Sequence, residues 1–252
     1  MSSAGFVDCH SHVVPSGDDG ASTVEQGIAL CRQAARHGTA VLFATPHVWP
    51  ELPLTEEREE SIRAAFEAVA AEAALDLRLG YELTPTAALL DEDPRRYTLA
   101  GTSTVLVEVP FDGPVDLLYL VAEHIEEAGL RPLIAHPERT EAVRADPRVA
   151  AQLADRGWAL QVNGSSLLGG HGPTAAALAW ELVEGRKAAL VASDGHRETR
   201  PPYLDEAYAA VARRLAPEEA TRMFDGSALG PGETGSMPRA RPRRHRAAAT
   251  GG

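Results

Sequence analysis

Short apolar runs recur along this 252-residue chain, and most of them end in a histidine or a carboxylate. Runs of three to five apolar or β-branched residues are typical of strands that are buried in a parallel sheet. The carboxyl ends of strands in a parallel barrel meet at one face of the fold. The side chains that end the runs are therefore expected to meet in one pocket. They lie in segments 8–12, 45–47, 80–82, 135–139 and 193–196, and at Glu108.

The apolar runs alternate with segments that have helical features. Ser22, with Glu25 three residues later and Gly38 beyond, predicts the start and stop of the first helix. Strands are expected at 5–9, 40–44, 77–83, 104–109, 132–135, 158–162 and 188–192. Helices are expected at 22–37, 55–74, 114–128, 174–184, 204–215 and 217–224, with a further helix that ends near residue 156.

This alternation predicts an α/β fold with a parallel sheet. Right-handed crossovers favour closure into a distorted seven-stranded (β/α)7 TIM-like barrel, with an open doubly wound sheet as the alternative. Residues 1–229 are expected to form one domain. Residues 230–252 are rich in Arg, Pro, Gly and Ala, and we expect them to be a disordered tail.

Charge and composition exclude several classes of protein. The net charge of −12 argues against a nucleic-acid-binding protein. Two cysteines do not make a disulfide framework, which suits a reducing compartment. The sequence has no signal-peptide pattern and no apolar run of the about 18 residues that a membrane helix needs. A cytoplasmic protein without membrane insertion is therefore expected.

The residues at the strand ends have the chemistry of metal ligands. His10 and His12 are two apart, so both imidazoles point the same way on an extended strand, and Asp194 and His196 repeat this spacing. Each motif alone is weak, because a single histidine is more often an ordinary surface or core residue. Glu82 and Glu108 end buried strands with no Lys or Arg nearby in sequence, and a metal or a distant Arg would offset the cost of burying them. Together, the motifs predict a polynuclear metal site and hydrolysis.

The motifs resemble those of the PHP (polymerase and histidinol phosphatase) superfamily, from about residue 7 to residue 224. Within it, the chain is similar to the bacterial protein-tyrosine phosphatases linked to capsule and exopolysaccharide synthesis. The motifs that carry the resemblance are D-x-H-S-H at 8–12, D-D-G at 18–20, T-P-H at 45–47, G-x-E at 80–82, A-H-P-E-R at 135–139, Q-x-N at 161–163, S-D-x-H at 193–196 and R-P-P at 200–202.

The resemblance implies three divalent metal ions, with Mn favoured and Fe or Zn as alternatives. Glu82 would join the first ion to the second. The implied ligands are His10, His12, Glu82 and Asp194 for the first ion, Glu82, Glu108 and His136 for the second, and Asp19, His47 and His196 for the third.

The implied activity is that of a metal-dependent phosphomonoesterase that hydrolyses phosphotyrosine in proteins through attack of a metal-activated hydroxide on phosphorus. Arg139 and Arg200 would bind the phosphoryl group, and Asp194 or His196 would move a proton. The alternatives are a small-molecule phosphatase such as histidinol phosphatase, a nuclease, and a binding protein without activity. A bacterial tyrosine kinase is the implied partner, and assembly into a homo-oligomer is possible in this group.

Several nearby residues have two interpretations. Trp49 either stacks on a substrate ring or packs under its loop. Gln161 and Asn163 bind either the ligands or the local loop. Asp8 is a candidate to fix the orientation of an imidazole. Cys9 is expected to point into the barrel wall, away from the histidines, and the chain lacks the C-x5-R loop of cysteine phosphatases.

Overall fold

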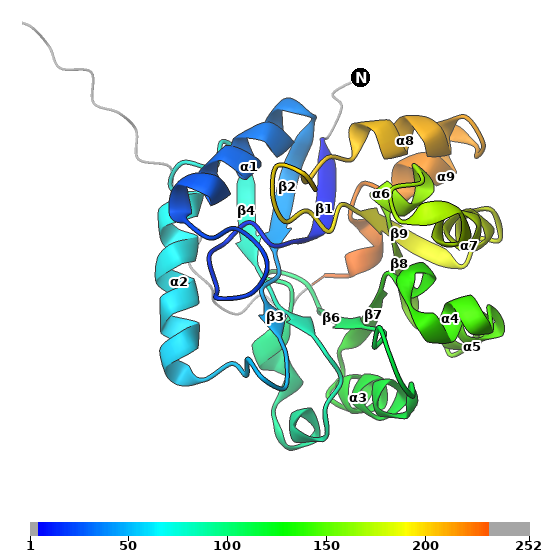
Figure 1. The fold of residues 1–252 in the computed structure, drawn as a ribbon, viewed down its shortest axis with the longest axis horizontal. Coiled ribbons are helices and arrows are strands. Elements are labelled where there is room, and N and C mark those ends of the chain that lie inside the picture. The colour runs from blue at the N-terminus through cyan, green and yellow to red at the C-terminus, as the bar shows by residue number, and fades with distance from the viewer. Residues whose placement is uncertain (1–4, 232–252) are drawn as a thin grey trace, which may run out of the picture.

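Short parallel strands occupy the centre of the molecule, and helices surround them (Figure 1). The computed structural model describes residues 5–231. Within these residues the strands are β1 Phe6–Ser11, β2 Thr39–Ala44, β3 His47–Val48, β4 Asp76–Leu79, β5 Glu82–Leu83, β6 Thr104–Glu108, β7 Arg131–Ala135, β8 Ala159–Asn163 and β9 Ala188–Ala192.

The strands form two sheets, with orders β1-β2-β4 and β3-β5-β6-β7-β8-β9, and every strand pair is parallel. Backbone hydrogen bonds continue beyond these ladders. The amide of Glu82 donates to the Pro46 carbonyl at 3.1 Å. After β9, the amide of Asp194 donates to the His10 carbonyl at 2.9 Å, so the last strand meets the first. The predicted α/β organisation with parallel strands is confirmed.

One of the seven predicted strands is divided in the structure, and a short strand that was not predicted follows the second predicted strand. The predicted strand 77–83 is β4 and β5, separated by Gly80 and Tyr81. Likewise, β3 follows β2 after Thr45 and Pro46. Proline has no amide hydrogen to donate to a ladder, which explains the break after β2. At Gly80 a Cβ atom would lie 2.5 Å from Leu99 Cδ2, so a glycine is required where the chain passes this side chain.

The predicted helices are present with corrected ends, and the structure adds the short helix α6, which was not predicted. Thr23, not Ser22, caps α1, because its side chain accepts a hydrogen bond from the Gln26 amide. The helix predicted to end near residue 156 is divided in two, and Pro147 lies between the parts. The helices are α1 Val24–Arg36, α2 Glu56–Ala70, α3 Asp116–Glu127, α4 Glu141–Ala145, α5 Arg148–Asp155, α6 Gly164–Leu167, α7 Gly172–Glu184, α8 Asp205–Ala212 and α9 Pro217–Arg222.

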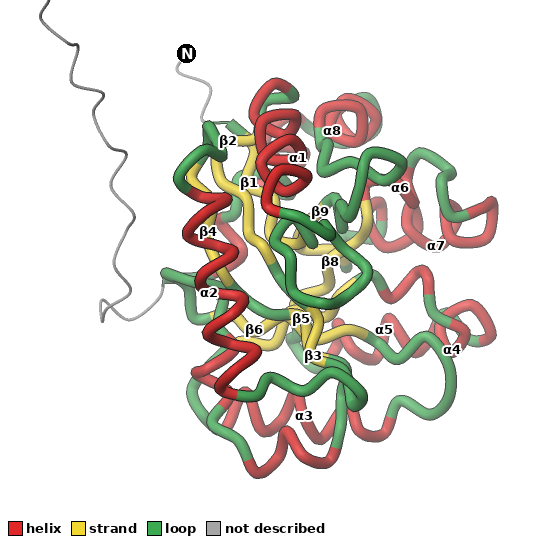
Figure 2. Tube along the Cα trace, turned by 60° about the vertical axis from the view of Figure 1, so that its left-hand side comes forward, coloured by secondary structure: helices red, strands yellow, loops and turns green. Residues whose placement is uncertain are grey.

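The core has two apolar clusters, and the strands are enclosed by helices on several sides (Figure 2). The larger cluster joins helices to strands. The smaller cluster takes residues from β1, β2, β6, β7 and β9, including Cys9, Phe43 and Leu106. Side chains two apart on a strand share a face, so Glu108 follows Leu106 toward the end of the strands. The apolar side chains are thus buried along the strands, and the polar side chains lie at the strand ends.

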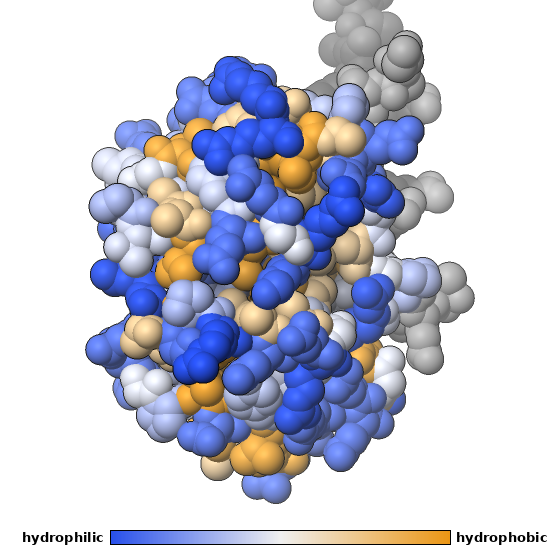
Figure 3. Space-filling view, turned by 90° about the vertical axis from the view of Figure 1, so that its right-hand side faces the viewer, coloured by the Kyte–Doolittle hydropathy of each residue, from blue (hydrophilic) through white to orange (hydrophobic). Residues whose placement is uncertain are grey.

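The outer surface over α4, α5 and α7 is mainly hydrophilic with scattered apolar areas (Figure 3). Among residues 5–231, no helix has the length and apolar content needed to cross a bilayer. Apart from Gly230 and Pro231, the predicted tail at 230–252 lies outside the described residues.

Candidate metal centre

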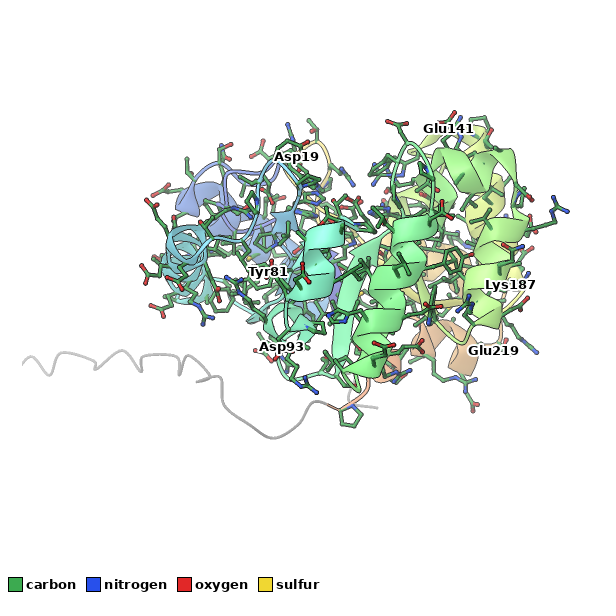
Figure 4. All side chains as sticks on the ribbon, turned by 90° about the horizontal axis from the view of Figure 1, so that it is seen from below. Asp19, Tyr81, Asp93, Glu141, Lys187 and Glu219 are labelled. Carbon is green, nitrogen blue, oxygen red and sulfur yellow. The ribbon has the colours of Figure 1, made fainter. Side chains whose placement is uncertain are left out.

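One pocket of about 250 Å³ lies at the ends of the strands. Figure 4 shows Asp19 at this edge of the molecule and Asp93 at the opposite edge. Eight of the ten pocket residues are predicted site residues, and Trp49 and Phe111 complete the lining. The residues that line the pocket are Asp19, His47, Trp49, Glu108, Phe111, His136, Arg139, Asp194, His196 and Arg200.

The fully buried carboxylate of Glu82 lies at the middle of the site. Its Oε2 atom is 3.0 Å from His10 Nε2, 3.2 Å from His12 Nε2 and 3.0 Å from His47 Nδ1. Its Oε1 atom is 2.9 Å from His136 Nε2. Burial alone would raise the pKa of Glu82, but the charges of His10 and His47 hold that pKa well below its usual range. One carboxylate therefore contacts four imidazoles.

Asp194, just beyond β9, is the second buried carboxylate of the site. Its Oδ1 atom is 3.5 Å from His10 Nε2 and 3.6 Å from His12 Nε2. Its Oδ2 atom accepts hydrogen bonds from Arg139 Nη1 at 2.5 Å, from Asn163 Nδ2 at 2.7 Å and from Arg200. Burial raises the pKa of Asp194, but the charges of His10, His136 and Arg200 outweigh it and lower the pKa. Asp194 thus joins the imidazoles to the arginines.

A third set of ligand atoms lies nearer to solvent. Asp19 Oδ1 is 3.2 Å from His196 Nε2 and 3.7 Å from His47 Nε2. The hydrogen bond from His196 is the largest influence on Asp19, and its pKa is lowered to about 2. The side chain of Asp19 is 49% exposed, so this part of the site is open to ligands from solvent.

The donor atoms fit divalent metal ions. The ligand atoms form three groups, and within each group they lie no more than 4.8 Å from one another. The groups are His12, Asp19, His47 and His196; His10, Glu82 and His136; and His10, His12 and Asp194. His10 Nε2 and His12 Nε2 are 3.2 Å apart, and two ligands at ~2.1 Å from one ion lie ~3.0–3.4 Å apart at ordinary angles. Glu82 Oε2 has three imidazole nitrogens around it but makes no hydrogen bond of acceptable geometry within the described structure. Mixed imidazole and carboxylate donors suit Mn, Fe or Zn.

Glu108 lies in the same pocket but outside these three groups. Its Oε1 atom accepts a hydrogen bond from the Thr84 hydroxyl, and its Oε2 atom has no hydrogen-bond partner within the described structure. Burial, together with the charge of Glu82, raises the pKa of Glu108 to about 8. The structure groups His10 with Glu82 and His136, and the expected place of Glu108 beside Glu82 and His136 stays a prediction.

A surrounding layer of polar side chains orients the ligands. Gln161 Oε1 is 3.0 Å from His10 Nδ1, and Gln161 donates to Asn163, which in turn donates to Asp194. These two residues therefore bind the ligands, which was one of the two predicted alternatives. Asp18 Oδ2 is 3.4 Å from His12 Nδ1, a role that the sequence reasoning missed. The D-D-G motif could have indicated this role, because it contains two adjacent acids. Only the second of them, Asp19, was predicted as a ligand.

Asp8 has a different role from the one expected. Its Oδ1 atom accepts from the Ser193 amide at 3.0 Å and from the His10 amide at 3.4 Å. Within residues 5–231, Asp8 makes no hydrogen bond or ion pair with an imidazole. Asp8 therefore joins β1 to the residue that follows β9, because its short side chain reaches backbone amides rather than a ring.

Two site residues have a left-handed backbone. The φ angles are +33° at His136 and +52° at Asp194. This region is unfavourable for residues other than glycine, and such strain is often found at functional sites. His136 directly follows β7 and Asp194 lies two residues after the end of β9, and both side chains line the pocket.

Cys9 packs with Phe43 and Leu106 in the smaller apolar cluster. Burial raises the pKa of its thiol far above the usual value, so Cys9 stays protonated. This agrees with a role in packing rather than as a nucleophile.

Residues 6–228 match the family described as capsular polysaccharide synthesis, CpsB/CapC. The chain belongs to this family. Tyrosine-protein phosphatase YwqE of Bacillus subtilis is 29% identical over 220 residues, which span 84% of this chain and 86% of the relative. Tyrosine-protein phosphatase CpsB of Streptococcus agalactiae serotype V is 27% identical over 232 residues, which span 87% of this chain and 95% of the relative.

Solved structures support membership of the CpsB/CapC family. One crystal structure, from a study of YwqE from Bacillus subtilis and CpsB from Streptococcus pneumoniae, superposes with a TM-score of 0.75. It is 26% identical and covers 86% of this chain and 91% of its own, and those proteins are described as metal-dependent tyrosine phosphatases. A phosphotriesterase homology protein from Escherichia coli, with a TM-score of 0.54, 9% identity and coverage of 89% of this chain and 97% of its own, shares the fold alone.

Proposed function

We propose that this CpsB/CapC family member is a metal-dependent phosphatase that hydrolyses phosphotyrosine in proteins. The observation that carries the proposal is the single pocket that combines three groups of metal-ligand atoms with two arginines. The names of the relatives agree with this activity, because YwqE and CpsB are tyrosine-protein phosphatases.

The proposed centre holds three divalent ions, with Mn favoured. When bound, such ions supply Lewis acidity and activate water at neutral pH. Nine ligands are proposed, with Glu82 shared between ions: His10, His12, Asp19, His47, Glu82, Glu108, His136, Asp194 and His196. The three groups of ligand atoms support eight of them, and the remaining one, Glu108, lines the same pocket.

The two arginines bind the phosphoryl oxygens in this proposal. Arg139 and Arg200 both line the pocket and both reach Asp194 Oδ2, so their guanidinium groups converge on one side of the site. A guanidinium presents paired N–H groups that match phosphoryl oxygens. Asp194 and His196 lie beside them, and one of the two carries a proton during turnover. The leaving phenolate of tyrosine has a pKa near ~10, which makes it a good leaving group for a phosphomonoesterase.

The scaffold under this centre is, in the same proposal, a distorted seven-stranded barrel formed within a single domain, residues 1–229. Counting β2 with β3 and β4 with β5 gives seven strands, since only two residues separate the members of each pair. The hydrogen bond between Asp194 and His10 supports closure of β9 onto β1.

The biological setting is part of the proposal as well. A protein with phosphorylated tyrosines is the expected substrate, and a bacterial tyrosine kinase that acts in polysaccharide synthesis is the expected partner. The cytoplasm is the expected compartment, and assembly into a homo-oligomer is compatible with the group. Nucleic acid is not an expected partner, because the chain carries a net charge of −12.

The experiment that tests the proposal compares two phosphomonoesters. We expect the Mn-loaded protein to release phosphate from a phosphotyrosyl peptide and to lose this activity after chelation of the metal. Histidinol phosphate should be a much poorer substrate. Turnover of histidinol phosphate without turnover of the peptide would instead assign the chain to small-molecule phosphatases.

A further inference from the structure

Two aromatic side chains line the pocket beside the metal ligands. The Trp49 ring stacks on His47 with a centroid distance of 4.3 Å and an angle of 30°. The Phe111 ring stacks on His136 at 5.4 Å and 28°. The Phe111 side chain is 40% exposed, so part of it is accessible to a ligand from solvent.

The two rings stack on histidines that share one carboxylate, and both rings line the same pocket. Glu82 Oε2 contacts His47, on which Trp49 stacks, and Glu82 Oε1 contacts His136, on which Phe111 stacks. Phe111 also lies under the guanidinium of Arg139, whose central carbon is 5.0 Å from the ring centroid. One aromatic ring is therefore next to His47 and the other is next to His136. Phe111 is also next to Arg139, which we assign to the phosphoryl group.

Both rings are carried by backbone that is held in place. Arg58 donates hydrogen bonds to the carbonyls of His47 at 2.8 Å and Leu52 at 2.9 Å, on either side of Trp49. The amide of Leu52 also donates to the Trp49 carbonyl at 3.0 Å. The amide of Glu141 donates to the Phe111 carbonyl at 3.1 Å. Anchored walls bind a ligand with a smaller loss of conformational entropy than mobile loops do.

We propose that Trp49 and Phe111 form an aryl subsite, which holds the ring of an aryl phosphomonoester while Arg139 and Arg200 hold its phosphoryl group. This inference rests on the proposed function and names the residues that select aryl over alkyl phosphomonoesters. A cavity of ~150 Å³ accommodates benzene, so the pocket of about 250 Å³ has room for a phosphoryl group and one ring. Alkyl phosphomonoesters fill the phosphoryl part of the site but have no ring that can contact Trp49 and Phe111.

Calorimetric binding of two non-hydrolysable probes to the Mn-loaded protein tests the subsite without a need for turnover. Phenylphosphonate carries the ring, and methylphosphonate carries only the phosphonyl group. We expect the wild-type protein to bind phenylphosphonate at least about 10-fold more tightly. A ring-on-ring contact is worth a factor of about 3 to 10, so Trp49→Ala and Phe111→Ala should each reduce the preference by that factor. Trp49→Phe should retain most of the preference.

The matched control is Leu120→Ala, because Leu120 is another exposed apolar side chain, 49% exposed on α3, that does not line the pocket. It should leave both affinities unchanged. An unchanged preference in Trp49→Ala and Phe111→Ala would overturn the subsite. Equal weakening of both probes in Phe111→Ala would also overturn it, since Phe111 would then act only by supporting Arg139. Selective binding of phenylphosphonate by a protein that fails to hydrolyse the phosphotyrosyl peptide would support the subsite and refute the proposed function.

Discussion

Replacement of Glu82 by Gln tests the metal centre most directly. The change keeps the size of the side chain but removes the negative charge that lies 2.9–3.2 Å from four imidazole nitrogens. Its new NH₂ group would donate hydrogen bonds where a metal ion requires an electron pair. We therefore expect Glu82→Gln to bind Mn at least about 100-fold more weakly, since loss of even an outer partner of a ligand costs about 10–100-fold.

Metal-dependent stabilisation provides the magnitude. At a free Mn concentration of about 100 times the wild-type Kd, binding stabilises the native state by about 2.7 kcal/mol. A 100-fold weaker site would gain only about 0.4 kcal/mol at the same concentration. The difference of about 2.3 kcal/mol corresponds to a loss of about 5–9 °C in the Mn-induced rise of Tm for a domain of this size.

Thermal unfolding with Mn and with a chelator, together with elemental analysis, measures this effect. Glu60→Gln is the matched control, because Glu60 is exposed on α2 and does not line the pocket, and it should leave the Mn-induced shift unchanged. A Glu82→Gln protein that keeps the full shift and the full metal content would refute the assignment of Glu82 as the shared ligand.

Three further changes separate the roles of nearby residues. Arg139→Ala should leave metal content unchanged but weaken inhibition by phosphate about 10- to 100-fold, and equal loss of metal would contradict its assignment to the phosphoryl group. Asp18→Asn should weaken Mn binding about 10-fold, measured by titration, because it loosens the contact with His12 Nδ1. Burial raises the pKa of Glu138 to about 7, so the stability that its neutral form contributes is lost as pH rises through that value. In the wild-type protein the free energy of unfolding should therefore fall between about pH 5 and about pH 8, and in Glu138→Gln this fall should be smaller by up to ~3 kcal/mol. Urea unfolding at both pH values measures the difference. An unchanged pH dependence would contradict a buried, neutral Glu138.

The general position of the site was predictable because parallel topology determines where strands end. His12 and Asp194 are 182 residues apart in the chain, yet each follows an apolar run, and the structure places their ligand atoms 3.6 Å apart. Periodicity and apolar runs report which face of an element is buried, so the long strands and helices were also predictable, whereas the breaks within them and the short elements β3 and α6 were not.

The partners of individual side chains were not predictable in the same way. The sequence grouped Glu108 with Glu82 and His136, but it did not indicate that His10 lies beside those two residues as well. Asp8 and Asp18 are both acids near the same histidines, and the difference between them depends on the path of the loop after β1. Such choices depend on side-chain torsions and local backbone turns, which a pattern of residue types does not specify.

The hydrogen bond that the Ser193 amide donates to Asp8 has a consequence for the synthesis and folding of the protein. It joins residues separated by 185 positions, so the pocket is complete only after the ribosome has released most of the chain. Shorter nascent chains hold His10 and His12 but not Asp194 or His196, and they cannot assemble the full set of ligands. Metal therefore binds late in biogenesis, after the pocket is complete. A chain whose synthesis or folding stops before that point is inactive.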